Sequence, residues 1–266
     1  MKLNYILIFW ICLTISCAKK DDNDQNDNNN QSNGGLISRI ENDAPPSYDQ
    51  GDNFYYENDK LQFLDVDNCS GLKYYFVYGN NGKVSKVYPF QDSNFDISHV
   101  DIQQITSNNT PVDYIYENGT LNRFEINGNP YKYFSYYKDG KLKEFEYPNN
   151  SKYIFEYTNN KVSKITSISL YSGNIVIYTF DFDDKINPIY KVFNQFGIFD
   201  VEICRSLEEM MMFRHLPVFT NNIERVYRDN ELIMSATYQY FESNYPERVI
   251  TNEEDGDQFS EFFTYE

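Results

Sequence analysis

The sequence predicts an all-β fold, an antiparallel meander of about a dozen strands that forms a curved or barrel-like sheet. Three observations predict it. Tyr and Phe number 25 and 21 among 266 residues, and both suit a pleated, half-buried strand. One short pattern recurs along most of the chain. The turns within that pattern are rich in Asn, Asp and Gly, which tight hairpins require.

The first segment, residues 1–16, is predicted to be an export signal. Met1 and Lys2 precede an apolar run that is too short to cross a bilayer, which needs about 20 apolar residues. A basic start, a short apolar core and small residues before a cleavage point are the parts of a secretory signal. Thr14-Ile15-Ser16-Cys17 resembles a bacterial lipobox, with Thr14 where Leu is usual. The resemblance implies that Cys17 is acylated; the alternative is an ordinary signal peptide with an incidental cysteine.

Residues 17–35 are predicted to be a disordered tether rich in Asn and Asp, which cannot bury enough apolar surface to fold. Lys19-Lys20-Asp21-Asp22 resembles the Lys-Asp-Asp export tag of Bacteroidota-type lipoproteins. That resemblance implies an outer-membrane protein displayed on the cell surface. If the four residues are only the start of the tether, the periplasmic side of the outer membrane is the alternative.

Residues 36–266 are predicted to be a single β-repeat domain. Each repeat has an aromatic residue, a tight polar turn, usually a lysine, an aliphatic residue, and another apolar residue three positions later. The aromatic residues are Tyr56, Tyr78, Tyr116, Tyr137, Tyr157 and Phe182. The aliphatic residues are Leu61, Val84, Leu121, Leu142, Val162 and Ile186. The repeat therefore predicts one hairpin per twenty-odd residues.

The turn residues predict the register of the hairpins. Asn118-Gly119 and Asp139-Gly140 are favoured central pairs of two-residue turns, and Asn159-Asn160 and Asp183-Asp184 are placed in the same way. At Asp139-Gly140 this puts Tyr137 across from Leu142 and Phe134 across from Phe145. These two pairs lie on opposite faces of the sheet unless a bulge shifts the register.

Two stretches depart from the repeat. An insertion runs from Phe90 to Pro111, and the pattern stops after Ile189. Ser206 and Glu209 form a capping box, which predicts one short helix near 207–216 that plugs the end of the sheet. Hairpins are predicted to resume at Arg228–Glu231 and Tyr238–Pro246, and Gln258–Glu266 supplies the last strand.

The repeated segments resemble the YD-type repeats of bacterial surface proteins, and more specifically a family of Bacteroidota lipoproteins of unknown function. Asp184-Lys185-Ile186-Asn187-Pro188 is similar to that family's Asp-x-Lys-x-Asn-Pro segment. Ser243-Asn244-Tyr245-Pro246 and Phe263-Thr264-Tyr265-Glu266 are similar to its closing hairpin. The resemblance covers about Leu36 to Glu266. It implies an all-β, curved or barrel-like meander and assigns no activity, so that no functional residue beyond the anchor follows from it.

Charge and reactive residues exclude several classes of function. The net charge of −17 repels phosphate backbones, so we expect no nucleic-acid partner, and attachment to an anionic membrane would fall to the lipid. Cys69 and Cys204 remain after processing and are either a disulfide or buried free thiols. His99 and His215, the only histidines, are interpreted as structural. We therefore expect no metal site, cofactor or catalytic residue.

The sequence favours a lipid-anchored, non-enzymatic envelope protein whose tyrosine-rich β-domain binds a glycan or an envelope protein. Tyrosine rings can stack on sugars, although tyrosine is also a common structural residue of sheets. The first alternative is a hydrolase of surface polysaccharide that uses a pair of carboxylates. The second is a purely structural envelope component. The ligand-binding residues are not identified by the sequence.

Overall fold

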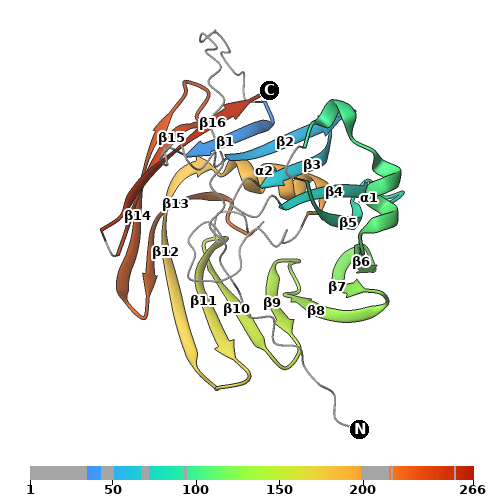
Figure 1. Cartoon of the computed structure of the whole chain (residues 1–266). Helices are drawn as coiled ribbons and strands as arrows, with labels where there is room; N and C mark the ends of the chain where they lie inside the picture. Colours follow the sequence, from blue (N-terminus) through green and yellow to red (C-terminus); the bar gives the residue numbers. More distant parts are fainter. Residues whose placement is uncertain are drawn as a thin grey trace, which may run out of the picture. The chain divides into compact units, whose positions relative to one another are not determined.

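The repeated turns fold the chain into successive hairpins whose strands pair in sequence order. The computed structural model describes residues 35–42, 51–66, 72–92, 95–198, 216, 218–254 and 256–266, all within one compact unit, Ser32–Glu266. In this part of the chain sixteen strands form one antiparallel sheet, which closes into a barrel because β1 pairs with β16 (Figure 1). The strands are β1 (Ile37–Asn42), β2 (Gly51–Glu57), β3 (Lys60–Val66), β4 (Leu72–Tyr78), β5 (Val84–Gln91), β6 (Val112–Glu117), β7 (Thr120–Ile126), β8 (Asn129–Tyr136), β9 (Leu142–Tyr147), β10 (Ser151–Thr158), β11 (Lys161–Ser169), β12 (Ile175–Ile186), β13 (Asn221–Arg228), β14 (Glu231–Tyr240), β15 (Pro246–Glu253) and β16 (Gln258–Tyr265).

The predicted antiparallel meander is confirmed, and the prediction of about a dozen strands is too low. Closure of the sheet removes both of its edges, so that the backbone of β1 and β16 is paired on both sides. The predicted hairpins at Arg228–Glu231 and Tyr238–Pro246, and the last strand, are also confirmed.

A β-bulge after each turn explains the three-residue spacing of the repeat. In the β2–β3 hairpin Tyr56 pairs with Leu61 and Tyr55 pairs with Phe63, so that one extra residue lies on β3. The extra residue shifts the alternation of side chains by one position. Leu61 and Leu64 therefore both face the interior, and each is 0% exposed. The same shift follows the turns of the β4–β5, β6–β7, β8–β9 and β10–β11 hairpins.

The register predicted for the β8–β9 hairpin is wrong in one of its two pairs. Phe134 pairs with Phe145 as predicted, but Leu142 pairs with Tyr136 and not with Tyr137. The cause is the bulge, which keeps Phe134, Phe145 and Leu142 in the same apolar core. The two pairs therefore do not lie on opposite faces of the sheet.

The predicted turns differ in their outcome. Asn118-Gly119 is a two-residue turn with positive φ at both residues, 51° and 78°, and Asn159-Asn160 also has positive φ at both. At Asp139-Gly140 only the glycine has positive φ, because the turn is longer: the Tyr137 N–H donates to the Lys141 carbonyl oxygen at 2.8 Å. The predicted turn at Asp183-Asp184 is wrong, since both residues lie inside β12.

The barrel wall is mainly apolar on its inner side and carries ion pairs on its outer side. A single core of aliphatic and aromatic side chains runs around the interior. On the outer side, ion pairs join neighbouring strands: Lys86 pairs with Asp113, and Lys152 lies 3.3 Å from both Glu144 and Glu146. In the described part of the chain no helix is long and apolar enough to cross a membrane.

The insertion predicted between Phe90 and Pro111 packs on the outside of the barrel. It contains a short 3-10 helix, η1 (Ile97–His99), and α1 (Ile102–Asn108), which Asp101 caps by accepting from the Gln104 N–H at 3.0 Å. Ile105 of α1 packs on Phe63 and Phe90 and forms a second, smaller apolar cluster. The insertion therefore covers outward-facing aromatic residues of β3 and β5.

A second helix, α2 (Pro188–Phe196), lies between β12 and β13. Its apolar residues Ile189, Val192, Phe193 and Phe196 repeat at helical spacing and join the barrel core, so that α2 fills one end of the barrel, called here the α2 end (Figure 1). The helix predicted near 207–216 falls almost wholly outside the described residues. The same is true of Cys17, Lys19, Lys20, Asp21 and Asp22, of Cys69 and Cys204, and of His215.

Candidate functional site

A hydrogen bond from a tyrosine hydroxyl joins several of the repeats to the repeat before them. The tyrosine that ends the first strand of a hairpin donates to the backbone carbonyl of the aliphatic residue that follows the previous turn. We call this contact the tyrosine clasp. This geometry joins Tyr78 to Leu61, Tyr116 to Val84 and Tyr157 to Leu142, and Tyr56, Tyr238 and Tyr265 make comparable bonds to the carbonyl oxygens of Ile37, Ile223 and Pro246, with distances of 2.6–3.1 Å.

The repeated lysine completes the clasp in the opposite direction. Lys83 Nζ lies 5.7 Å from the centre of the Tyr116 ring of the next hairpin, and Lys141 Nζ lies 5.5 Å from that of Tyr157. Lys60 makes the same contact with Tyr78, at 5.1 Å. Such cation–π contacts contribute about 0.5–1 kcal/mol at exposed sites. The repeat of tyrosine, turn, lysine and aliphatic residue is therefore the sequence signature of a two-way contact between hairpins.

Burial of the clasp tyrosines changes their acidity. Loss of solvent raises the pKa of Tyr116 to about 12 from an ordinary value of 10. The pKa values of Tyr56, Tyr78 and Tyr157 are also raised, first by burial and, for Tyr56 and Tyr157, also by nearby ionisable groups. Each of these hydroxyls therefore stays protonated at neutral pH, as a donor to a carbonyl must.

The clasp is absent between the β6–β7 and β8–β9 hairpins. Tyr136 occupies the clasp position, because it pairs with Leu142 as Tyr116 pairs with Leu121. In the described part of the chain its hydroxyl has no hydrogen-bond partner, although burial raises its pKa. The lysine of the preceding repeat is replaced by Thr120. Both the tyrosine hydrogen bond and the lysine–ring contact are therefore missing between the β6–β7 and β8–β9 hairpins.

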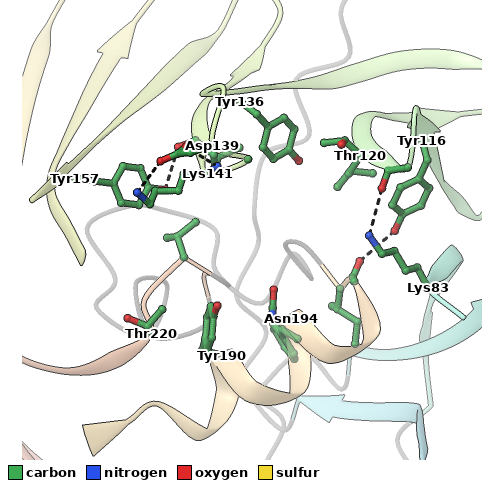
Figure 2. Close-up of a pocket in the computed structure, with 18 of the residues that line it drawn as sticks. Lys83, Tyr116, Thr120, Tyr136, Asp139, Lys141, Tyr157, Tyr190, Asn194 and Thr220 are labelled. Carbon is green, nitrogen blue, oxygen red and sulfur yellow. Dashed lines mark hydrogen bonds and ion pairs between the residues drawn. The ribbon is translucent and has the colours of Figure 1, made fainter. Parts of the chain in front are cut away.

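A pocket of about 750 Å³ opens where the clasp is absent. Its walls come from the turns after β4, β6, β8 and β10, and its floor comes from α2. Figure 2 shows the Tyr136 hydroxyl directed into the cavity, Lys83 and Lys141 on opposite sides, and Asn194 rising from α2. The lining residues are Lys83, Tyr116, Gly119, Thr120, Leu121, Tyr136, Asp139, Gly140, Lys141, Leu142, Tyr157, Asn160, Tyr190, Phe193, Asn194, Gly197, Ile198, Val218 and Thr220.

The polar groups of the pocket are mostly neutral. Asp139 is the carboxylate among the described lining residues, and it pairs with Lys141 at 2.7 Å. Hydrogen bonds from the Lys141 side chain and backbone lower the pKa of Asp139. Lys141 also donates to Asn160 at 3.0 Å. The remaining polar groups are hydroxyls and amides, which bind uncharged hydroxyl-rich ligands or single charged groups.

Sequence reasoning missed α2, which forms the floor of the pocket. Three signals for it are present. Asn187 is a favourable N-cap, Pro188 stands at the first helical position, and Gly197 ends the helix with φ of 66°. The Asn187 side chain accepts from the Ile189 N–H at 3.0 Å. The Asn-Pro pair carries both the resemblance to a family segment and this helix-start signal, and only the resemblance enters the sequence prediction.

Asp96, Ser98 and His99 form a cluster with the composition of a catalytic triad but not its geometry. Ser98 Oγ and Asp96 Oδ2 contact the same ring nitrogen, His99 Nδ1, at 2.9 and 2.8 Å. In a working triad the serine and the carboxylate contact different nitrogens. Asp96 instead caps η1 by accepting from the Ser98 N–H. Hydrogen bonds from Ser98 and His99 lower the pKa of Asp96 to about 2. The cluster is therefore a helix cap.

Comparison with known proteins adds little to this geometry. No family model matches the chain, and no curated protein matches it. Among solved structures, a porin-like protein from Bacteroides uniformis is similar, with 11% sequence identity and a TM-score of 0.34. The match covers 81% of this chain and 77% of that chain. At this level the similarity carries no argument about function, and the resemblance of the hairpins to YD-type repeats stays a prediction.

Proposed function

We propose that this chain is a lipid-anchored protein of the cell envelope, displayed on the surface of the outer membrane, and that its barrel binds a glycan in the pocket at the α2 end. The observation that carries the proposal is the Tyr136 hydroxyl. In every neighbouring repeat the equivalent hydroxyl is used to hold the barrel together. Between the β6–β7 and β8–β9 hairpins, the Tyr136 hydroxyl faces a cavity instead.

The composition of the pocket fits a sugar. Sugars present apolar C–H faces and a rim of hydroxyl groups. Tyr116, Tyr136, Tyr157 and Tyr190 supply aromatic surface, and their polar tips suit a site that is partly wet. Asn194 and the nearby amides and hydroxyls can donate to or accept from sugar hydroxyls. The volume of about 750 Å³ lies within the usual range of small-ligand pockets.

The pocket favours binding over hydrolysis. Glycoside hydrolysis ordinarily needs two carboxyl groups that flank the scissile bond. Among the described lining residues Asp139 supplies one carboxylate, and Lys141 holds it ionised in a turn. A carboxylate held in this way is a poor general acid, because its lowered pKa keeps it deprotonated. The concave shape also fits a small ligand better than a flat protein surface.

Replacing Thr120 by lysine is expected to abolish glycan binding. By analogy with Lys83 and Lys141, the new ammonium group would lie over the Tyr136 ring and reach the next turn, which fills the pocket. We expect a loss in affinity of at least about tenfold, with stability unchanged or raised by about 0.5–1 kcal/mol. The measurement is calorimetric titration of the full chain with the best ligand from an array of soluble oligosaccharides.

Lys60→Thr is the matched control for this experiment. It creates the same lysine-to-threonine difference in a repeat whose lysine does not line the pocket. It should leave glycan affinity unchanged. If no oligosaccharide binds the unaltered chain, or if Thr120→Lys binds as tightly as the unaltered chain, the proposed glycan site is wrong. Capture of an envelope protein in that case would favour the protein-partner alternative.

The anchor is tested separately through Cys17. Because residues 14–17 resemble a lipobox, membrane attachment is assigned to acyl chains on this residue. Cys17→Ala should abolish incorporation of a labelled fatty acid, whereas Cys69→Ala should retain it. A label that persists in Cys17→Ala would contradict the anchor. Protease added to intact cells should digest the barrel, and its survival would place the protein on the periplasmic side.

A further inference from the structure

We propose that the glycan bound in this pocket is acidic, and that Lys83 recognises the carboxylate of a uronic acid unit. This inference rests on the proposed function and specifies its ligand. The first argument is local charge. The chain as a whole carries −17, yet among the described residues the charged lining side chains are Lys83, Lys141 and Asp139, which sum to +1. A positive site in a strongly acidic protein points to a negatively charged ligand group.

Lys83 supplies the charge that no carboxylate in the described part of the chain pairs with. Its Nζ lies 3.3 Å from the Gly119 carbonyl oxygen and 5.7 Å from the centre of the Tyr116 ring, both of which are neutral. Lys141, on the other side of the cavity, is paired with Asp139. A ligand carboxylate at Lys83 would form a charge-assisted hydrogen bond, which is about twice as strong as a neutral one.

The helix end beside Lys83 does not cancel this charge. The C-terminus of α2 carries at most about half a negative charge, and the effect fades within one turn. Two of its carbonyls also have hydrogen-bond donors: Ile198 N–H donates to Phe193 at 2.9 Å, and the Tyr116 hydroxyl, which donates to Val84 at 3.0 Å, also lies 3.3 Å from the Gly197 oxygen. A full ammonium charge therefore remains available to the ligand.

The neutral donors around the cavity favour a carboxylate over a phosphate. The Tyr136 hydroxyl and the Asn194 amide face the same cavity as Lys83 (Figure 2). A single lysine with neutral donors suits a singly charged planar group. Phosphate sites typically combine arginine forks or helix N-termini, and here α2 presents its C-terminal half to the pocket.

The test compares each uronic acid oligosaccharide with its methyl ester, which keeps the sugar ring and removes the charge. Galacturonate, glucuronate, mannuronate and guluronate oligomers are titrated into the full chain, with sugar phosphates as a further arm. We expect one acid to bind at least about tenfold more tightly than its ester. Lys83→Gln should remove this preference, so that the acid and its ester bind the variant with equal affinity.

Lys60→Gln is the matched control, because Lys60 makes the same ring contact outside the pocket. It should preserve the preference for the acid, and thermal unfolding of both variants reports any loss of folding. Equal binding of acid and ester, a preference that survives Lys83→Gln, or tighter binding of sugar phosphates would overturn the acidic-sugar inference and leave the glycan site standing. Absence of binding to any sugar would overturn the proposed function itself.

Discussion

Raising the pH from 10 to 12 is expected to unfold the barrel cooperatively. The clasp tyrosines hold successive hairpins together as neutral donors to backbone carbonyls. A phenolate has no proton to donate, and its charge is costly in a buried site. The clasps at Tyr56, Tyr78, Tyr116 and Tyr157 all need a protonated hydroxyl, so ionisation removes each of these hydrogen bonds.

The sign of the effect follows from the direction of the pKa shifts. Burial raises the pKa of Tyr116 from 10 to about 12, and the pKa values of the other clasp tyrosines rise as well. A raised pKa means that the folded state holds its proton more tightly than the unfolded state does. The stabilisation is therefore complete below pH 10 and is lost as the pH passes the raised values.

The free energy of unfolding lost on ionisation of the clasp tyrosines is large compared with the total stability of an ordinary protein. Each unit of pKa shift corresponds to about 1.4 kcal/mol, and this is reduced here because the rings are partly exposed. Several tyrosines contribute together. Their sum is expected to remove much of a total stability of about 5–15 kcal/mol.

Circular dichroism and tyrosinate absorbance, followed through the same titration, measure this effect. Tyr78→Phe should cost about 1 kcal/mol at neutral pH, because the Leu61 carbonyl loses its partner, and should shift alkaline unfolding to higher pH. Tyr171→Phe is the control, since Tyr171 is 94% exposed. If all tyrosines titrate near pH 10 while the barrel stays folded, the clasp is not a stabilising contact.

Truncating one inward phenylalanine is expected to have the second large effect. Phe155 is 0% exposed and lies with its ring centre 5.7 Å from that of Phe145. Phe155→Ala removes the ring from a closed core that has little freedom to collapse. The expected loss in free energy of unfolding is about 3–5 kcal/mol. Denaturant titration of the full chain measures this loss, and the slope of the free energy of unfolding against denaturant concentration is compared between variants.

Phe262→Ala is the matched control on the outer side of the wall. Phe262 is 40% exposed, and the Arg248 guanidinium lies 5.0 Å from its ring centre. We expect a loss below about 1 kcal/mol, since surface substitutions rarely cost more. Equal losses in free energy of unfolding for the two variants would contradict the assignment of Phe155 to the inner side and Phe262 to the outer side of the barrel.

The sequence was informative wherever one repeat carried both the turn and its flanking strands. Asn118-Gly119 predicted its hairpin correctly because positive φ at two successive residues is a local requirement. The error at Tyr137 has a different origin. The bulge is specified by the packing of Leu142 and Phe145 on the same core, and such packing is decided by the closed sheet.

Asp183-Asp184 shows the same limit. Local composition favoured a turn there, yet the Asp183 carboxylate accepts from the backbone N–H of Asn222, a residue that lies beyond α2. That contact between distant segments keeps the two aspartates inside β12. Turn propensity was outweighed by a partner that the linear sequence does not place nearby.

The antiparallel meander, the recurring hairpins and the acidic, tyrosine-rich character of the chain can be predicted from the linear sequence, because they depend on residues close together. The sequence also carries the predicted lipid anchor at Cys17. Closure of the barrel, the tyrosine clasps and the pocket depend on the tertiary structure. The Tyr136 hydroxyl and Lys83 meet the same cavity only after successive hairpins pair and α2 fills the barrel end. A binding site of this kind is assembled from turns far apart in the chain. Its lining residues come together only when the sheet has closed.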